Sequence, residues 1–295
     1  YRSNDMVVCI SKVTHEILQN VAPEVDSCYL PHAVHSNIFK PATTQEQLAK
    51  AKEVRDAIDG HSSMKNPKKK VFFWNNRNAR RKQSGTLVWW FKEWLDKVGH
   101  DKAALLMHTD AEDPHGQPLP HLIQHLDIED GQVLLSTNKV SSEELSDLYR
   151  ACDYTINISD AEGFGLGTLE SLACGSPIIV NMTGGLQEQV TDGTNWFGWG
   201  IQPSSKSVIG SLQVPYIYED RINQQDFEKM LTKAINLPKK KYEALSEAGR
   251  QHVLDNYNFE DYEKGWVKII DDFVEKHGSW ENRKNFKAWH FMEVA

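Results

Sequence analysis

Cysteines are few in this sequence, long apolar runs are absent, and positive charge is in deficit. The four cysteines among 295 residues include no C-x-x-C pair, so we expect buried free thiols in a reducing compartment rather than disulfides or zinc ligands. No apolar run reaches the roughly 18 residues that a membrane-spanning helix needs. The formal net charge of −8 argues against a general nucleic-acid binder, which would carry a basic surplus.

A secretory signal is also missing, because no basic segment near the start is followed by a short apolar one. A cytoplasmic protein is therefore expected, and peripheral association with a membrane surface stays open. The chain begins at Tyr1, and Asp5–Ser11 is predicted to be a buried strand with no element before it. We accordingly expect that an N-terminal region is missing.

Strand-like and helix-like segments alternate along the chain, which predicts an α/β fold with a parallel sheet. The series from Val71 to about Asp192 is expected to form one doubly wound, Rossmann-like unit, in which ligands bind beyond the carboxyl ends of the strands. The expected strands are short apolar segments: Val7–Ser11, Ser27–Leu30, Val71–Trp74, Ala103–His108, Val133–Ser136, Tyr154–Ile158 and Pro177–Asn181. No element is assigned to Trp196–Tyr218, and the tail Phe259–Lys276 is predicted to be an amphipathic helix.

A glycine-rich segment, Glu162–Glu170 (EGFGLGTLE), follows the predicted strand Tyr154–Ile158 and opens a helix. Its glycines let the backbone approach a ligand closely, and the helix N-terminus offers unpaired N–H groups and a positive dipole end for phosphate. Glu162 and Glu170 each accept two hydroxyl hydrogen bonds, which suits a hexose diol and a ribose diol with a pyrophosphate between them. Glycine-rich turns are common in α/β proteins, and Glu170 alone could merely favour the helix dipole.

Two further segments are expected at the same edge of the sheet. Asn76–Lys82 (NRNARRK) follows the strand Val71–Trp74, and its cations could reach a diphosphate, although such clusters are often solvated loops. Thr183–Glu188 (TGGLQE) follows another strand and opens another helix, and a plain turn explains it equally well.

The pattern E-G-F-G-L-x₃-E-S-L-A-C-G-S-P-I-I, followed by G-G-x-x-E, resembles the E-x₇-E signature of retaining glycosyltransferases of the GT-B fold, the family 4-like "glycosyl transferases group 1". The similarity runs from about Asp5 to Phe273. Leu30–Pro41 resembles the interdomain segment of that family, Arg77 and Lys82 match its R-x₄-K, and Thr137–Leu148 resembles its base-side loop and helix.

The resemblance implies a role for each matching residue. Arg77 and Lys82 would neutralise the diphosphate leaving group, Glu162 would hold hydroxyls of the transferred sugar, and Glu170 would bind the ribose diol. Backbone around Asn138–Val140, including Asn138 and Val140, would pair with the base. The backbone N–H groups expected to contact the sugar and phosphates belong to Gly163, Phe164, Gly165 and Leu166. No metal or other cofactor is implied, because basic side chains and a helix terminus would stabilise the diphosphate.

The sequence departs from the family at several positions. Asn76 replaces the usual Gly before the arginine. In the interdomain segment, His32, Ala33 and His35 stand where Asn, Gly and Asp are typical, and these three differences put the local hinge contacts in doubt. The family's N-terminal acceptor domain, with its catalytic His, is not in this chain. The expected organisation is therefore an end of that domain plus the hinge (1–42), a nucleotide-sugar domain (43–257), and a helical tail that would cross back (258–295).

Two other segments of the sequence are compatible with different ligands. A metal site could form in the His-rich stretch 108–125, where His121 and His125 have helical ligand spacing, and Trp196 and Trp199 could stack on a sugar or be buried.

The sequence thus predicts a metal-independent, retaining hexosyltransferase. It would use a UDP- or GDP-linked sugar and an unknown glycan, lipid or protein acceptor, with no nucleic acid partner. The alternatives are a nucleotide-sugar-binding module that is inactive without the acceptor domain, and another GT-B enzyme such as a sugar-nucleotide epimerase.

Overall fold

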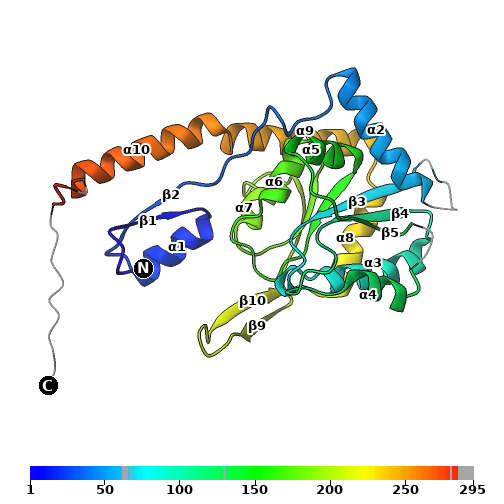
Figure 1. Ribbon diagram of the computed structural model, residues 1–295, viewed down its shortest axis with the longest axis horizontal. Coiled ribbons are helices and arrows are strands. Elements are labelled where there is room, and N and C mark those ends of the chain that lie inside the picture. The colour runs from blue at the N-terminus through cyan, green and yellow to red at the C-terminus, as the bar shows by residue number, and fades with distance from the viewer. Residues whose placement is uncertain (62–65, 67, 129–130, 280, 285–295) are drawn as a thin grey trace.

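The computed structural model describes residues 1–61, 66, 68–128, 131–279 and 281–284 of the chain. Figure 1 shows a larger α/β unit built on one central sheet, and a smaller unit joined to it by a long helix. Within the described residues, none of the helices combines the length and apolar character needed to cross a membrane.

A six-stranded parallel sheet forms the centre of the larger unit. Its strands are β3 (Lys70–Asn75), β4 (Ala103–His108), β5 (Val133–Ser136), β6 (Tyr154–Asn157), β7 (Ile178–Asn181) and β8 (Gly198–Ile201). Their spatial order is β5-β4-β3-β6-β7-β8, and every neighbouring pair is parallel. The chain builds outward from β3 on one side and then returns to build outward from β6 on the other. The predicted doubly wound sheet is confirmed, with its switch point between β3 and β6.

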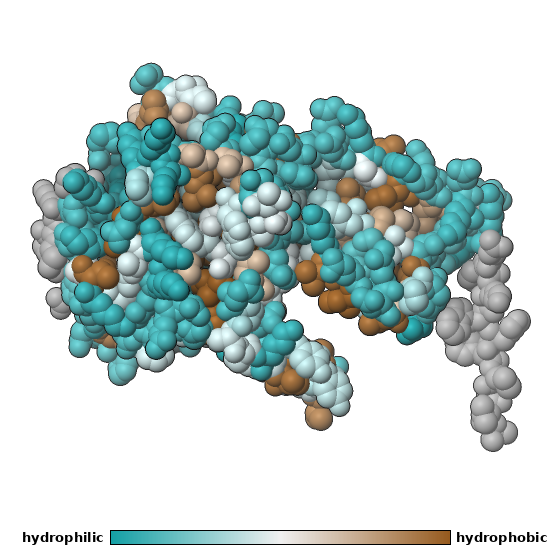
Figure 2. Space-filling model, turned by 180° about the vertical axis from the view of Figure 1, so that it is seen from behind, coloured by the Kyte–Doolittle hydropathy of each residue, from teal (hydrophilic) through white to brown (hydrophobic). Residues whose placement is uncertain are grey.

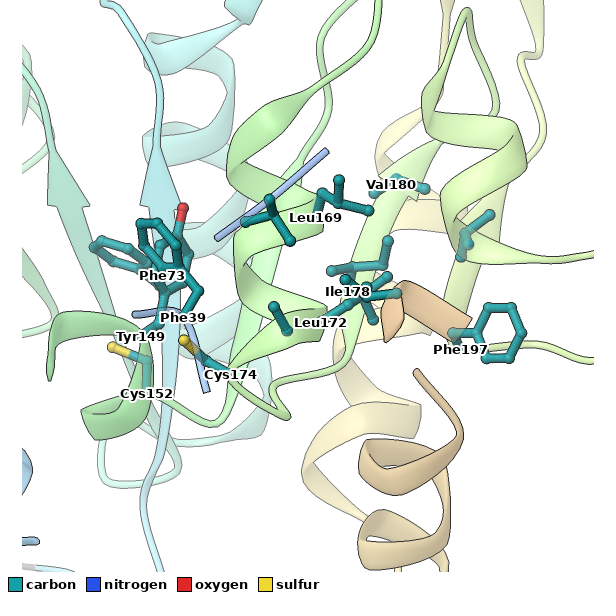
Figure 3. Packing of buried hydrophobic residues seen from close by; sticks show 14 of the residues in the cluster. Phe39, Phe73, Tyr149, Cys152, Leu169, Leu172, Cys174, Ile178, Val180 and Phe197 are labelled. Atoms are coloured by element: carbon teal, nitrogen blue, oxygen red, sulfur yellow. The ribbon is translucent and has the colours of Figure 1, made fainter. Parts of the chain in front are cut away.

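Helices cover both faces of this sheet because its strands are apolar on both sides. In β3, Phe72 and Trp74 belong to one hydrophobic cluster, and Val71 and Phe73 belong to the other, as the alternation of side chains along a strand requires. The first cluster includes residues of α3 (Ser84–Val98), α4 (Leu119–His125) and α8 (Gln224–Ile235). The second, shown in Figure 3, includes residues of α2 (Gln45–Gly60), α5 (Ser142–Ala151), α6 (Leu166–Ala173), α7 (Leu186–Val190) and α9 (Lys239–Asn256).

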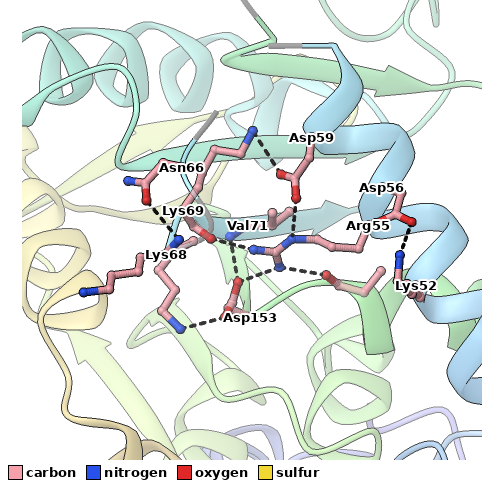
Figure 4. A network of polar contacts seen from close by, with 11 residues as sticks. Lys52, Arg55, Asp56, Asp59, Asn66, Lys68, Lys69, Val71 and Asp153 are labelled. Atoms are coloured by element: carbon pink, nitrogen blue, oxygen red, sulfur yellow. Dashed lines mark hydrogen bonds and ion pairs between the residues drawn. The ribbon is translucent and has the colours of Figure 1, made fainter. Parts of the chain in front are cut away.

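A polar network connects α2 to the N-terminal ends of the strands β3 and β6 (Figure 4). The carboxylate of Asp153 accepts hydrogen bonds from Arg55 at 2.9 Å, from Lys70 at 2.8 Å and from the backbone N–H of Val71 at 2.8 Å. Arg55 also donates to the carbonyls of Lys69 and Ala151. Because Asp153 is nearly buried and has three donors, the network holds its charge in place.

The smaller unit consists of two parallel strands, β1 (Met6–Cys9) and β2 (Asp26–Tyr29), the helix α1 (Lys12–Val21), and the far part of α10 (Phe259–His277). Lys276 and His277 of α10 pair with Asp26 of β2. The chain passes between the units twice, and the two crossings touch. The N–H of Val34 donates to the carbonyl of Tyr257 at 3.0 Å, and the ring of His35 stacks on Phe259 at 3.8 Å.

An antiparallel hairpin projects from the larger unit between β8 and α8 (Figure 1). It consists of β9 (Ser205–Ile209) and β10 (Ile217–Arg221). Figure 2 shows hydrophobic residues on this projection. Its exposed large side chains include Leu212, which is 98% exposed, and the aromatic Tyr216, which is 76% exposed.

Most predicted elements are present within one or two residues of their expected bounds. The segment Trp196–Tyr218, to which no element was assigned, instead contains β8, β9 and the first two residues of β10. The predicted boundaries at 42 and 257 stay a prediction, and residues 285–295 of the expected tail lie outside the described part of the chain.

Candidate functional site

The carboxyl ends of β3 and β6 lie side by side at the switch point of the sheet. The loop after β3 contains a short 3₁₀ helix, Arg80–Lys82, and Gln83 follows it in the left-handed region with φ 55°. The loop after β6 leads through Glu162 into α6. The topology thus brings together the ends of the two sequence segments that were expected to hold a nucleoside diphosphate sugar.

Lys82 and Glu162 form an ion pair at this point. Both side chains are 9% exposed, and Asn157 donates a second, longer hydrogen bond of 3.5 Å to the Glu162 carboxylate. Burial lowers the pKa of Lys82, while the facing carboxylate of Glu162 opposes that shift. The arrangement holds a cation in a largely dry position, where it acts more strongly on an anion than it would in water.

Arg77, the other basic residue predicted to act on the diphosphate, pairs with Asp113 instead of Glu162. Its guanidinium forms two hydrogen bonds with Asp113, at 2.7 and 3.3 Å, and contacts His115 at 2.9 Å. The hydrogen bond from Arg77 lowers the pKa of Asp113 below its usual value. The role of Arg77 stays a prediction, and it requires the side chain to leave Asp113.

Arg80 and Arg81, which lie between Arg77 and Lys82 in the sequence, have other partners. Arg80 forms a fork with Glu219 of β10, with N–O distances of 2.6 and 3.1 Å, and Glu219 is only 1% exposed. Arg81 donates to the carbonyl of Ala161 at 2.7 Å and lies 3.8 Å from Glu162. The basic segment therefore anchors the hairpin and the Glu162 loop as well as supplying Lys82.

The glycine-rich turn that opens α6 has the backbone shape its sequence suggested. Gly165 is the N-cap residue and has φ 94°, a conformation that favours glycine. A Cβ at Gly163 would meet a single atom, at 3.9 Å, so its surroundings are open. Phe164 is buried and packs edge-to-face on His32 at 5.2 Å, whereas the side chain of Leu166 is about half exposed. Their backbone contacts to sugar and phosphate stay a prediction.

The pair Gly184–Gly185 allows a close approach that the sequence analysis missed. A Cβ at Gly184 would lie 1.6 Å from the carbonyl oxygen of Glu162, and one at Gly185 would lie 2.7 Å from Cα of Phe164. The turn before α7 thus packs directly on the Glu162 loop. Two adjacent glycines after a strand were the signal available for this contact.

Glu170 lies at the end of a short hydrogen-bonded chain. Asn75 donates to the hydroxyl of Tyr149, and that hydroxyl donates to Oε2 of Glu170, each at 2.9 Å. Burial raises the pKa of Glu170 to about 7, against the hydrogen bond from Tyr149. Asn75 and Tyr149 were not predicted to belong to the site. Nothing in the spacing of single residues indicates that α5 and β3 both contribute to the orientation of Glu170.

Asn138 and Val140 occupy the loop after β5, also at the carboxyl edge of the sheet. Asn138 is exposed and Val140 is partly buried. Within the described residues, no hydrogen bond joins either of them to the Lys82–Glu162 pair. Contact with a nucleobase stays a prediction for this loop.

Two other sequence hypotheses concerned metal and tryptophan. In the described part of the chain, no group of three or more His, Cys, Asp or Glu side chains has an arrangement that could hold a metal ion. Trp199 packs on Tyr154 with ring centroids 5.6 Å apart, while Trp196 remains about half exposed at the edge of the sheet.

The sequence model of the family described as glycosyl transferases group 1 matches residues 62–252, about two thirds of the chain. The chain belongs to this family. The match includes Lys82, Glu162 and Glu170, and the resemblance stated from the sequence is confirmed.

Curated relatives in this family match parts of the chain. An alpha-monoglucosyldiacylglycerol synthase of Streptococcus pneumoniae is 26% identical over 189 residues, which are 64% of this chain and 40% of the relative. A D-inositol 3-phosphate glycosyltransferase of Kineococcus radiotolerans is 40% identical over 78 residues, 26% of this chain and 18% of the relative. The chain therefore spans less than half of the length of these relatives.

Solved structures of glycosyltransferases share the fold. Sucrose-phosphate synthase from Thermosynechococcus elongatus gives a TM-score of 0.70 at 20% identity, over 92% of this chain and 59% of that one. Anabaena Alr3699/HepE in complex with UDP-glucose gives 0.68 at 15% identity, over 91% and 64%. The fold of this group 1 glycosyltransferase is of the GT-B type.

Proposed function

We propose that this chain carries the donor site of a retaining, metal-independent hexosyltransferase that uses a nucleoside diphosphate sugar. The observation that supports this most strongly is the buried Lys82–Glu162 pair at the switch point, beside the N-terminus of α6. The solved structure of Alr3699/HepE with UDP-glucose favours a uridine nucleotide for this chain as well.

In the proposed arrangement each charged group has a separate task. Lys82 stabilises the diphosphate as a point charge, and the backbone N–H groups at the start of α6 contact the phosphate oxygens. Glu162 holds hydroxyls of the transferred sugar, and Glu170 accepts hydrogen bonds from the ribose diol. The ion pair orients both Lys82 and Glu162 before the donor arrives, which reduces the reorganisation needed at the transition state.

The proposed transfer exchanges one C–O bond for another. The bond from the anomeric carbon to the diphosphate oxygen breaks, and the diphosphate leaves with the electron pair. The acceptor oxygen forms the new bond on the same face of the oxocarbenium-like sugar, and its proton passes to the departing diphosphate. Lys82 lowers the energy of this step because negative charge grows on the leaving group.

A thermal-shift and calorimetric screen of UDP-, GDP- and ADP-sugars against the 295-residue chain tests the proposal. We expect saturable binding of one nucleotide class, and competition between that sugar nucleotide and the free nucleoside diphosphate. If none of the three classes binds, the donor site is refuted.

A second candidate function for the same site is a nucleotide-sugar-binding module without turnover on its own, because the groups proposed to hold the donor, Lys82, Glu162 and the N-terminus of α6, can bind a nucleotide sugar without an acceptor. Release of nucleoside diphosphate from the bound donor, measured with and without hydroxyl acceptors, separates the two. Binding without release would favour the module.

A further inference from the structure

The β9–β10 hairpin is attached by its base to the loops of the proposed donor site. The backbone N–H of Asp220 donates to the carbonyl of Asp160 at 2.8 Å. Asn181 donates to the carbonyls of both Asp220 and Ser159 at 2.9 Å, and the hydroxyl of Thr183 donates to the Asp220 carboxylate at 2.8 Å. The base of the hairpin is therefore a fixed wall beside the carboxyl ends of β6 and β7.

A cavity of about 440 Å³ lies between this wall, the turn before α7 and the start of α1. Residues of the hairpin base, of the turn and of α1 line it, among them Val13, Gly184, Gln187, Ser205, Lys206 and Asp220. Its size is within the range of small-molecule sites. Gly184, which lines the cavity, also packs against the backbone carbonyl of Glu162, so the turn before α7 is shared between the cavity and the loop of the residue proposed to hold the transferred sugar.

The lining combines polar side chains of balanced charge with the apolar Val13, Met182 and Pro203. Nζ of Lys206 is 3.7 Å from Oδ1 of Asp220, which is longer than a hydrogen bond, so both groups can still bond to a ligand. A hydroxyl can donate to Asp220 while a neighbouring hydroxyl accepts from Lys206. The side chain of Val13 adds an apolar surface for ring C–H groups. An anion would gain from Lys206 but would be repelled by Asp220.

We propose that this cavity is the acceptor subsite and that it binds a neutral polyhydroxylated ring, a sugar or a cyclitol. The assignment as acceptor subsite rests on the proposed donor function, whereas the binding of a polyol does not. The hairpin would then determine which acceptor ring this glycosyltransferase accepts, since it contributes Ser205, Lys206 and Asp220 to one wall.

Saturation-transfer NMR on the 295-residue chain tests the proposal, with methyl α-D-glucopyranoside and myo-inositol as probes and an inositol monophosphate as the anionic comparison. Spectra are recorded with and without UDP, and UDP affinity is measured separately by calorimetry. We expect saturation of at least one neutral ring, at lower concentration than the phosphate. Asp220→Asn should weaken that binding about tenfold, as loss of a hydrogen bond to a charged group does.

A pair of bulky variants separates the cavity from the rest of the hairpin. Ser205→Trp fills the cavity and should abolish the saturation, whereas Gln213→Trp, at the exposed tip, should leave it unchanged; unchanged melting temperatures show that both fold. Absence of saturation by both neutral rings, preference for the phosphate, or equal effects of the two Trp variants would each overturn the inference. If UDP binds in those cases, the proposed donor function stands; if UDP fails to bind while a neutral ring does, the donor function falls and the polyol site remains.

Discussion

The hydroxyl of Tyr149 donates a 2.9 Å hydrogen bond to Oε2 of Glu170, and Asn75 donates in turn to the same hydroxyl. This chain of three side chains links α5, α6 and the end of β3. It fixes the orientation of a carboxylate whose pKa burial raises to about 7, so the group titrates near neutrality.

The affinity for UDP should therefore depend on pH through Glu170. A ribose diol bonds best to the ionised carboxylate, so affinity should increase as pH rises from 6 to 8 through the pKa of about 7. One unit below its pKa the carboxylate is only about one tenth ionised, and affinity should fall by up to about tenfold. Calorimetric titrations at several pH values measure this. Glu170→Gln has no ionisable group at this position, so its pH profile reports the titration of UDP alone. Parallel pH profiles of UDP affinity in the unaltered protein and in Glu170→Gln would contradict the ribose role of Glu170.

Glu170→Ala should weaken the binding of free nucleoside diphosphate, because contacts to ribose do not need the sugar. Loss of hydrogen bonds to a charged group predicts about a tenfold effect, measured by calorimetry with UDP and GDP. Glu143→Ala, on the exposed start of α5, is a control that should bind normally. Unchanged affinity in Glu170→Ala would mean that the ribose lies elsewhere.

Lys82→Ala should lower the affinity for UDP about tenfold or more and leave the affinity for uridine nearly unchanged. The reason is that the Lys82 ammonium acts on phosphate rather than on the nucleoside. Competition with a fluorescent nucleotide measures both ligands on one protein. Lys97→Ala is the control, since Lys97 lies in the last turn of α3 and pairs with Glu228 of α8. Equal losses for UDP and uridine would argue against a phosphate role.

Gly184→Ala should destabilise the fold by at least about 3 kcal/mol, the range of severe packing conflicts, because its Cβ would lie 1.6 Å from the carbonyl oxygen of Glu162. Gly193→Ala is a matched control: it also has a positive φ, but its Cβ would meet nothing within 4 Å. Only the conformational strain of roughly 1–2 kcal/mol should appear there. Urea denaturation compares them, and equal losses would show that contact with Glu162 is unimportant.

Asp153→Ala should cost about 3 kcal/mol of unfolding free energy, because it leaves the partly buried cations Arg55 and Lys70 without their shared partner. Asp56→Ala breaks an exposed pair with Lys52 on the same helix and should cost at most about 1 kcal/mol. Chemical denaturation measures both. A loss as small in Asp153→Ala as in Asp56→Ala would show that the network does not hold α2 to the sheet.

The sequence was sufficient to predict five strands of the central sheet, β3 to β7, because they are short apolar runs separated by segments of helical periodicity. β8 was missed because two of its four residues are glycines, which are depleted in strands. The hairpin was missed because neither of its strands has a buried hydrophobic face: β9 has no buried residue, and the buried residue of β10 is Glu219. The alternation of strands and helices predicted that the segments containing Lys82 and Glu162 would lie at the same edge of the sheet. Their ion pair was not predicted.

The sequence did not predict hydrogen-bond and ion-pair partners that depend on tertiary contacts. The link from Asn75 through Tyr149 to Glu170 depends on how α5 packs over the sheet. The pairing of Arg77 with Asp113, and of Arg80 with Glu219, depends on the paths of two loops. A basic cluster predicts that cations are near a phosphate site, but it does not predict which of them faces the site before a ligand arrives.

The two chain crossings between the units, joined by Val34 and Tyr257 and by the stacked rings of His35 and Phe259, restrict how the units can move. Two crossings joined at one place would favour a hinge, with rotation about a line through them, over a sliding movement. The 19-residue helix α10 starts at this line and, at 1.5 Å per residue, is about 28 Å long. A turn of about 10° at its base would carry its far end, and β2 paired with it through Asp26, through about 5 Å. A small change of angle beside Phe259 is thus magnified into a displacement as wide as a sugar ring.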